Sequence, residues 1–286
     1  MCFDQKSSFG FAGVGLFAAW WIYTRTDNAE LASGVFFFFT MEFLQGLQYF
    51  VIADNEGDMY KPGSMCDDVI NQVLTVAGFL HICLQPYYCH VINASLTNDP
   101  KYIPQYKCIK RLCLIGGAML FGRFIMGYLG IQTTMDTSFK LGEPTGASTE
   151  WLRGDKLCTF NGKYHLAWAV PMADPSYYVP GAAIHSFLMY APFLALYEKK
   201  GMIIQGVVLF TTGPMLAAYI TPNLMEQASI WCFFSIMQIT TMLFGIREAL
   251  ILNWGKDDHR FSLMDKKGIA RSDDRKGVAP KAKKTK

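Results

Sequence analysis

The chain has 286 residues, of which 51% are apolar and 17% are charged, and its formal net charge is +3. Soluble globular domains carry roughly 25% charged residues, and the apolar residues here come in long blocks, so the composition argues against a water-soluble enzyme. The net charge is small and its basic residues gather near the C-terminus, which argues against nucleic acid as a partner.

Seven apolar segments are long enough to cross a lipid bilayer as helices, for which about 20 residues are needed. They span residues 9–24, 31–53, 69–92, 112–131, 179–197, 202–221 and 228–252. We therefore predict an all-α fold in which residues 1–252 form an integral membrane bundle of seven transmembrane helices. In this bundle, residues 132–178 form a long outer loop.

The first segment has an alternative interpretation as a signal peptide, because Lys6 precedes a short apolar run. However, no small-residue cleavage site precedes the charged turn at residues 25–30. The glycines and alanines of the segment also suit close packing between helices. We therefore expect this segment to span the membrane.

The distribution of lysine and arginine predicts the orientation, because the cytoplasmic side of a membrane protein normally carries more of them. The side that includes residues 253–286 carries 18 of these residues, and the opposite side carries six. The prediction is an N-terminus outside and a C-terminus in the cytoplasm. Residues 253–286 are expected to be a disordered basic tail, which either binds anionic lipid or is simply solvated and fixes the topology.

Three of the eight cysteines, Cys2, Cys66 and Cys158, fall on the predicted outer side of the membrane. Cys66 lies just before the third span, and Cys158 lies in the long loop. The oxidising environment outside the cytoplasm permits a disulfide between them, which would hold the loop over the helices. Two free thiols are the alternative.

Ionisable side chains inside a membrane are rare and are often functional. Glu42, His81 and Arg123 all fall near the middle of predicted spans, so one buried polar cluster is expected to contain all three. The other residues assigned to this cluster are Gln45, Gln85, His185 and Gln238.

The spacing of these residues supports the cluster. Gln45 lies on the same helix face as Glu42, and Gln85 lies on the same face as His81. Pro86 has no amide proton for the carbonyl four residues before it, so that carbonyl is left as a free acceptor beside a predicted kink.

Three functions fit such a cluster. We favour a proton, ion or small-solute pathway, in which Glu42 and Arg123 form a buried ion pair and His81 carries or gates protons or ions. The second function is a receptor-like seven-helix sensor with a ligand pocket under the long loop. The third is a haem-binding or metal-binding membrane protein, with His81, His185 and Glu42 as candidate ligands. A structural hydrogen-bond network is the alternative to all three.

Several other functions are disfavoured. Residues 228–252 contain no lysine, which argues against covalently bound retinal. The chain has no phosphate-binding loop, nucleophile elbow or zinc-protease motif, so no catalytic residues are assigned and an enzyme is not the favoured class. The expected partners are the lipid bilayer and a small solute or ion, and an oligomer is compatible with the sequence.

The second and third spans also carry a family resemblance. The pattern begins with a glycine-rich first span. It continues with Met41-Glu42-x-Leu44-Gln45 on the second span and His81-Ile82-x-Leu84-Gln85-Pro86 on the third. This pattern resembles a family of polytopic membrane proteins of unknown function from microbial eukaryotes and bacteria. The resemblance covers the first third of the chain and implies a polytopic membrane fold without a known activity.

Overall fold

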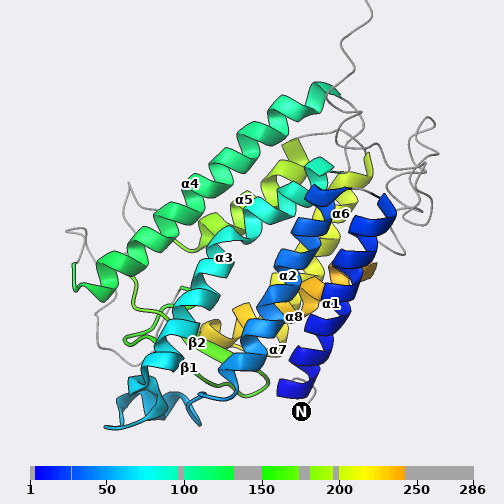
Figure 1. Cartoon of the computed structure of the whole chain (residues 1–286). Coiled ribbons are helices and arrows are strands. Elements are labelled where there is room, and N and C mark those ends of the chain that lie inside the picture. The colour runs from blue at the N-terminus through cyan, green and yellow to red at the C-terminus, as the bar shows by residue number, and fades with distance from the viewer. Residues whose placement is uncertain are drawn as a thin grey trace, which may run out of the picture.

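The computed structural model describes residues 4–26, 28–95, 100–131, 150–173, 181–195 and 200–241. This part of the chain is mostly helical (Figure 1). Its α-helices are α1 (Gln5–Thr26), α2 (Ala29–Gln48), α3 (Val69–Ser95), α4 (Ile103–Tyr128), α5 (Ala183–Ala195), α6 (Lys200–Phe210), α7 (Leu216–Ile220) and α8 (Leu224–Thr241). A π-helix, η5 (Thr211–Met215), joins α6 to α7, and short 3-10 helices occur at η1 (Glu56–Tyr60), η2 (Met65–Asp67) and η3 (Pro100–Tyr102).

The expectation of a helical fold is confirmed, because each of the seven predicted segments falls on one or more of these helices. Seven transmembrane helices are not established. Two helical stretches, Val69–Ser95 and Ile203–Ile220, are long and apolar enough to cross a membrane by length and composition. The other helices of the described part miss this standard, because they are shorter, as α5 is, or include more polar residues.

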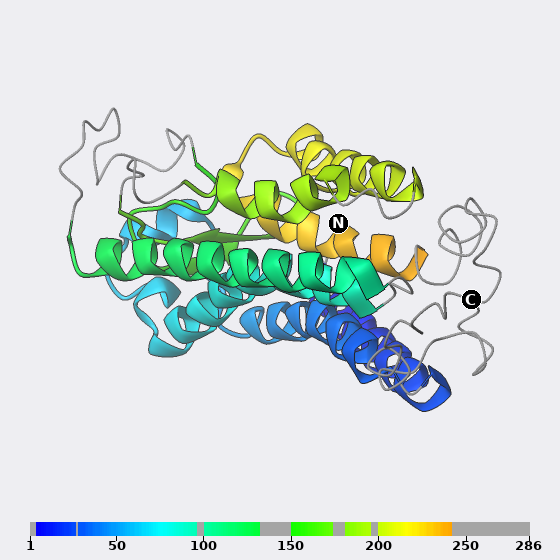
Figure 2. The same ribbon diagram turned by 90° about the horizontal axis from the view of Figure 1, so that it is seen from above.

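The helices lie side by side and alternate in direction (Figures 1 and 2). In Figure 2, α1 and α2 lie on one side of α4, and α5 and α6 lie on its other side. Near the N-terminus of α1, the Gln5 side chain donates to the Gly46 carbonyl at the end of α2, 3.2 Å away. The start of α3, the end of α4 and the starts of α5 and α8 lie at this same end, as shown by the contacts of Asn71, Arg123, Ala182 and Glu226 described below.

A small cap covers this end of the bundle, formed by residues 150–173. It contains a two-stranded antiparallel sheet of β1 (Cys158–Asn161) and β2 (Leu166–Ala169), in which Cys158 pairs with Ala169. The strands are buried except at Asn161, and β2 packs against α8. The sequence analysis predicted only a loop here, because two strands of four residues are too short to give a periodic pattern.

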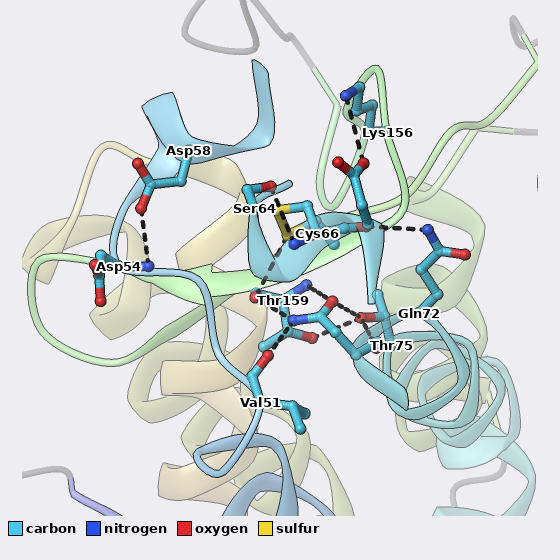
Figure 3. Close-up of a disulfide and its surroundings, with 12 residues drawn as sticks. Val51, Asp54, Asp58, Ser64, Cys66, Gln72, Thr75, Lys156 and Thr159 are labelled. Carbon is cyan, nitrogen blue, oxygen red and sulfur yellow. Dashed lines mark hydrogen bonds and ion pairs between the residues drawn. A yellow bond between two sulfur atoms is a disulfide. The ribbon is translucent and has the colours of Figure 1, made fainter. Parts of the chain in front are cut away.

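The disulfide between Cys66 and Cys158 is present and joins η2 to β1 (Figure 3). Asn71 at the start of α3 reinforces this link, because its side chain donates to the carbonyls of Val51 and Thr159 at 2.7 and 2.8 Å. The Thr159 amide donates back to Asn71 Oδ1 at 3.0 Å. The cap is therefore tied covalently and by hydrogen bonds to the start of α3.

Some polar side chains of the helices are buried, and some large apolar side chains are exposed. On α2, Glu42 and Gln45 are fully buried together with apolar residues such as Phe38, whereas Phe36 and Phe43 are 47% and 51% exposed. A helix at the surface of a soluble protein turns its apolar stripe inward and its polar face to water. The exposed side of α2 departs from that pattern at these two phenylalanines.

Candidate functional site

Two cavities lie in series along the bundle, and we call the one beneath the cap the cap cavity and the other the distal cavity. The cap cavity is lined by Ile82, Gln85, Leu120, Trp151, Leu152, Ala182, His185, Pro214, Ala217, Gln227, Ala228, Trp231 and Cys232. The distal cavity is lined by Phe38, Cys89, Ile92, Asn93, Met189, Gln205, Leu209, Ser235, Gln238 and Ile239.

Successive turns of the same helices line the two cavities. Gln85 is followed one turn later by Cys89 on α3, and His185 is followed one turn later by Met189 on α5. The π-helix Thr211–Met215 lies between the α6 residues of the distal cavity and the α7 residue of the cap cavity. Pro214 of this turn lines the cap cavity, and π-helical turns occur frequently at functional sites.

The cavities are small. Counted as the space open to the centre of a water molecule, their volumes are about 20 Å³ beneath the cap and about 40 Å³ in the distal cavity. A single water needs roughly 10–15 Å³ in this measure. Each cavity therefore has room for at least one molecule the size of water.

His185 contributes an imidazole ring to the wall of the cap cavity. Its ring lies near the carbonyl of Ile82 on α3, which is the carbonyl that Pro86 leaves without an amide partner. The ring packs edge-on against Trp231, with centroids 5.1 Å apart. Nε2 of His185 is buried and has no hydrogen-bond partner among the described residues.

The rest of the cap cavity is closed by neutral groups. Gln85 Nε2 donates to Cys232 Sγ at 3.1 Å, and Trp151 Nε1 donates to Gln227 Oε1 at 2.9 Å. The neighbouring cap residue Leu152 has a positive φ of 66°, which is a strained conformation for a residue with a large side chain.

Neutral side chains also line the distal cavity. Gln205 Nε2 donates to Asn93 Oδ1 at 3.3 Å, and Gln238 Nε2 donates to Thr212 Oγ1 on the π-helix at 2.6 Å. Gln238, predicted as part of the polar cluster, thus connects α8 to the π-helical turn. It lies in a different cavity from Gln85 and His185.

The expected ion pair between Glu42 and Arg123 is wrong. Arg123 is fully buried and instead forms a two-pronged ion pair with Glu150 of the cap, at 2.5 and 2.7 Å. Arg123 also donates to the Ala173 carbonyl, and Glu150 accepts from the Ala182 amide. The partner was missed because Glu150 lies in a loop that the hydropathy pattern did not place against any helix.

Glu42 on α2 has different neighbours from Arg123. Its side chain is fully buried, and neither carboxyl oxygen makes a hydrogen bond of normal geometry with a described residue. The hydroxyl of Ser8 on α1 lies close enough to interact with the carboxyl. Glu42 is therefore a buried carboxyl group that no cation of the described part neutralises.

His81 serves the packing of α2 against α3. Its Nε2 lies 2.7 Å from the Phe37 carbonyl, and its ring stacks on the Phe37 ring with centroids 3.9 Å apart. In the part of the chain that the structure describes, no group of three His, Cys, Asp or Glu side chains is placed to hold a metal ion. His81, His185 and Glu42 thus do not converge on one metal site.

His165, which is not among the predicted cluster residues, joins the cap to α2. Its Nε2 lies 3.0 Å from Gln45 Oε1, and its Nδ1 lies 3.0 Å from the Tyr49 hydroxyl. This geometry fits a neutral ring that donates from Nε2 and accepts at Nδ1. Burial lowers the pKa of His165 to about 3, so the ring is neutral at physiological pH. A single histidine in a loop gives no sequence signal for such a contact.

Glu226 at the start of α8 binds the turn that connects β1 to β2. Its carboxylate accepts hydrogen bonds from the amides of Tyr164 and His165 and from the Thr221 hydroxyl. A carboxylate in the first turn of a helix also interacts favourably with the helix dipole. This contact fixes His165 next to α2.

Comparisons with known proteins give a family and one relative. A family described as being of unknown function, DUF5765, matches residues 6–251. An uncharacterized protein of Acanthamoeba polyphaga mimivirus is 26% identical over 205 residues, which cover 70% of this chain and 76% of the viral protein. No solved structure matches the chain.

Proposed function

Because the chain belongs to DUF5765, a family of unknown function, its activity has to be inferred from its own residues, and we propose a membrane protein with a pathway for protons or a small solute. The proposal has two parts. The first places all seven helical segments in the membrane. The second places the pathway along the cap and distal cavities.

The exposed surface of the helices supports the first part. On α4, Leu112, Ile115 and Ile125 are 49%, 57% and 42% exposed, while Arg123 on the same helix is fully buried. Water would strongly disfavour such an apolar surface, whereas lipid tails accept it. The alternating helix directions also agree with a chain that crosses a bilayer repeatedly.

The arrangement of the two cavities in series is the observation that carries the second part. Helices α3, α5 and α8 line both cavities, and the π-helical turn lies in the chain between the α6 residues of one cavity and the α7 residue of the other. The lining side chains are apolar groups, amides, a hydroxyl, thiol groups and one imidazole. A lining without carboxylates or basic groups that are charged at neutral pH favours an uncharged solute over an ion.

The proposal is tested by flux into liposomes that contain the purified protein. Water permeability is measured by light scattering after an osmotic step, and proton entry is measured with an internal pH dye. A pathway raises at least one of the two rates above that of protein-free liposomes. Equal rates in both assays would reject a pathway for protons or water-sized solutes.

A matched pair of glycine substitutions tests the location of the pathway. A Cβ added at Gly213 would lie 2.7 Å from Trp231 Nε1 and 3.4 Å from Gln238 Nε2, so Gly213→Val forces a shift of side chains that line the two cavities. Gly122 has no atom within 4 Å of an added Cβ, so Gly122→Val is the control. We expect the first substitution, and not the second, to reduce flux.

A receptor-like sensor is the second candidate, because the cap residues Trp151 and Leu152 close a cavity that a ligand could fill. A ligand that binds only the folded protein raises its melting temperature. A sensor would therefore show ligand-dependent stabilisation without flux in either liposome assay.

A further inference from the structure

One face of α4 carries basic side chains near its N-terminal end and apolar side chains along the rest. We propose that this face binds an anionic phospholipid, with the headgroup at Lys107, Lys110 and Arg111 and an acyl chain along the apolar residues that follow. The inference rests on the first part of the proposed function, because a lipid covers α4 only where the helix lies in a membrane. It goes further by naming the class of lipid and the side chains that select it.

Helix α4 lies at the edge of the bundle (Figure 1). It packs against α3 and α5, where Gly117 lies against the Cys83 carbonyl and Gly116 lies against Leu188. Gly122 is on the other face, and no atom lies within 4 Å of a Cβ added there. This face of α4 is therefore open, whereas the opposite face is closed by its neighbours.

The open face forms one continuous stripe, because residues three or four positions apart lie on the same side of a helix. The stripe runs through Lys107, Arg111, Leu114, Ala118, Gly122 and Ile125. All of these residues except Gly122 are exposed, and Lys110 beside them is half-buried. The stripe thus begins with cations and continues as an apolar surface.

The apolar part of the stripe has the length of an acyl chain in one leaflet. The hydrocarbon core of a bilayer is about 30 Å thick, so one leaflet accounts for about 15 Å, or about ten residues of an α-helix. Starting from Arg111, about this length of helix leads past Leu114 and Ala118 to Gly122. A headgroup at Arg111 therefore lets a chain extend over this surface to the middle of the bilayer.

The basic side chains of the stripe lack a countercharge among the described residues. Helix α4 contains no Asp or Glu, and the side chains of Lys107, Lys110 and Arg111 form no ion pair or hydrogen bond in the described part. Each basic residue near an anionic membrane surface strengthens binding roughly fivefold. A zwitterionic headgroup is attracted less, because it carries a cation of its own. The charge of the stripe therefore selects an anionic lipid.

A second copy of the chain fits this face less well than a lipid does. In a two-fold dimer both copies contribute the same surface. An axis along the membrane normal would then place Lys107 and Arg111 of both copies at one end of the interface. These like charges repel each other, whereas an anionic headgroup neutralises them.

The test counts the lipids bound to the full-length protein in detergent by native mass spectrometry. The probes are phosphatidylglycerol, which is anionic, and phosphatidylcholine, which is zwitterionic and has the same acyl chains. The test variant is Lys107→Gln/Arg111→Gln. The control variant, Lys61→Gln/Lys163→Gln, removes the same charge from two exposed lysines at the cap end.

We expect phosphatidylglycerol to bind with saturation and more tightly than phosphatidylcholine. Lys107→Gln/Arg111→Gln should weaken its binding roughly 25-fold, and the control variant should leave the affinity unchanged. Phosphatidylglycerol with a photoreactive group on an acyl chain should label α4 between Leu112 and Ile125. This labelling uses the unmodified protein, so it tests the site even if the variant folds poorly.

Equal affinity for the two lipids, equal losses in the two variants, or labelling spread evenly over the helices would each overturn the inference. Glycerophosphate is the headgroup without acyl chains, and equal competition by it would show a general anion site instead. A dimer cross-linked through α4 would assign the face to a second copy.

Extraction of membranes with alkaline sodium carbonate separates this inference from the proposed function. A protein released by carbonate would reject the membrane proposal and the lipid site together. A protein that stays in the membrane but shows no lipid preference would reject only the lipid site. A lipid preference without flux would reject only the pathway.

Discussion

The imidazole of His90 on α3 contacts the backbone carbonyl of Leu188 on α5, with Nε2 and the oxygen 2.9 Å apart. Leu188 lies four residues before Pro192, so its carbonyl has no amide partner within its own helix. His185 on α5 likewise lies near the Ile82 carbonyl on α3, which Pro86 leaves without an amide partner. Each of these two helices thus has a proline that frees a carbonyl and a histidine that lies beside the freed carbonyl of its neighbour.

This relationship predicts an energetic coupling between His90 and Pro192. His90→Phe should lower the free energy of unfolding by roughly 1–3 kcal/mol, because it leaves the buried Leu188 carbonyl with only the weak, long contact from the Cys113 thiol. Pro192→Ala should reduce that loss, because the new amide can bond the same carbonyl. A double-mutant cycle from thermal unfolding in detergent measures the coupling, and strictly additive effects would contradict the pairing.

The ion pair of Arg123 and Glu150 predicts a large effect of a single substitution. Arg123→Met leaves the partly buried Glu150 carboxylate with only its longer contact to Arg153, at 3.9 Å, and should destabilise the protein by roughly 3–5 kcal/mol. Adding Glu150→Gln should recover part of that loss, because the poorly compensated carboxylate charge is then gone. Lys61→Gln is the control, because Lys61 is 69% exposed in its pair with Asp58 and should matter little.

Loss of the disulfide should loosen the cap. Cys66→Ser should lower stability by roughly 2–5 kcal/mol, and a reducing agent should have the same effect on the unmodified protein but none on the variant. Cys108→Ser is the matched control, since Cys108 is an exposed free thiol. Proteolysis after Lys156 reports the state of the cap, because this exposed lysine lies two residues before Cys158. Unchanged proteolysis of Cys66→Ser would show that the disulfide does not hold the cap.

His165 predicts a loss of stability in acid. Its pKa is about 3 in the folded protein because of burial, and about 6.5 in an unfolded chain. Above pH 6.5 the ring is neutral in both states, so it adds no pH dependence. As the pH falls from 6.5 towards 3, the unfolded chain takes up a proton that the folded chain does not, and the free energy of unfolding falls by roughly 1.4 kcal/mol per pH unit.

His165→Gln should remove this contribution and reduce the proton uptake on unfolding by about one. Urea unfolding at several values between pH 5 and 7 measures the difference between the variant and the unmodified protein. Parallel pH profiles would mean that His165 is as accessible to protons in the folded protein as in the unfolded chain.

Glu42 tests whether protons use the pathway. If its carboxyl group takes part in proton transfer, Glu42→Gln should reduce proton flux by roughly tenfold or more while water permeability and the melting temperature stay near their original values. Glu30→Gln on the exposed face of the same helix is the control. Equal proton flux in Glu42→Gln and the unmodified protein would remove Glu42 from the pathway.

The sequence by itself determined which segments are helical and which residues of α2 face inward. Blocks of apolar residues mark helices through their length and composition, and the spacing of Glu42 and Gln45 puts them on one face because helix geometry is local. For Cys66 and Cys158 the sequence offered a disulfide and two free thiols as alternatives, from their positions in the two loops on one predicted side, and the structure has the disulfide.

Only the tertiary structure decided which residues meet. Arg123 pairs with Glu150 rather than Glu42, His165 reaches Gln45 across 120 residues of sequence, and His185 turns to the cap cavity instead of joining His81. These contacts depend on how helices and cap pack against one another, and a periodic pattern holds no information about the partner of a face. Local helix geometry therefore turned the polar residues inward. Long-range packing alone placed Arg123 in an ion pair with Glu150, Gln45 in contact with His165 of the cap, and the remaining polar residues His185 and Gln238 in two separate cavities.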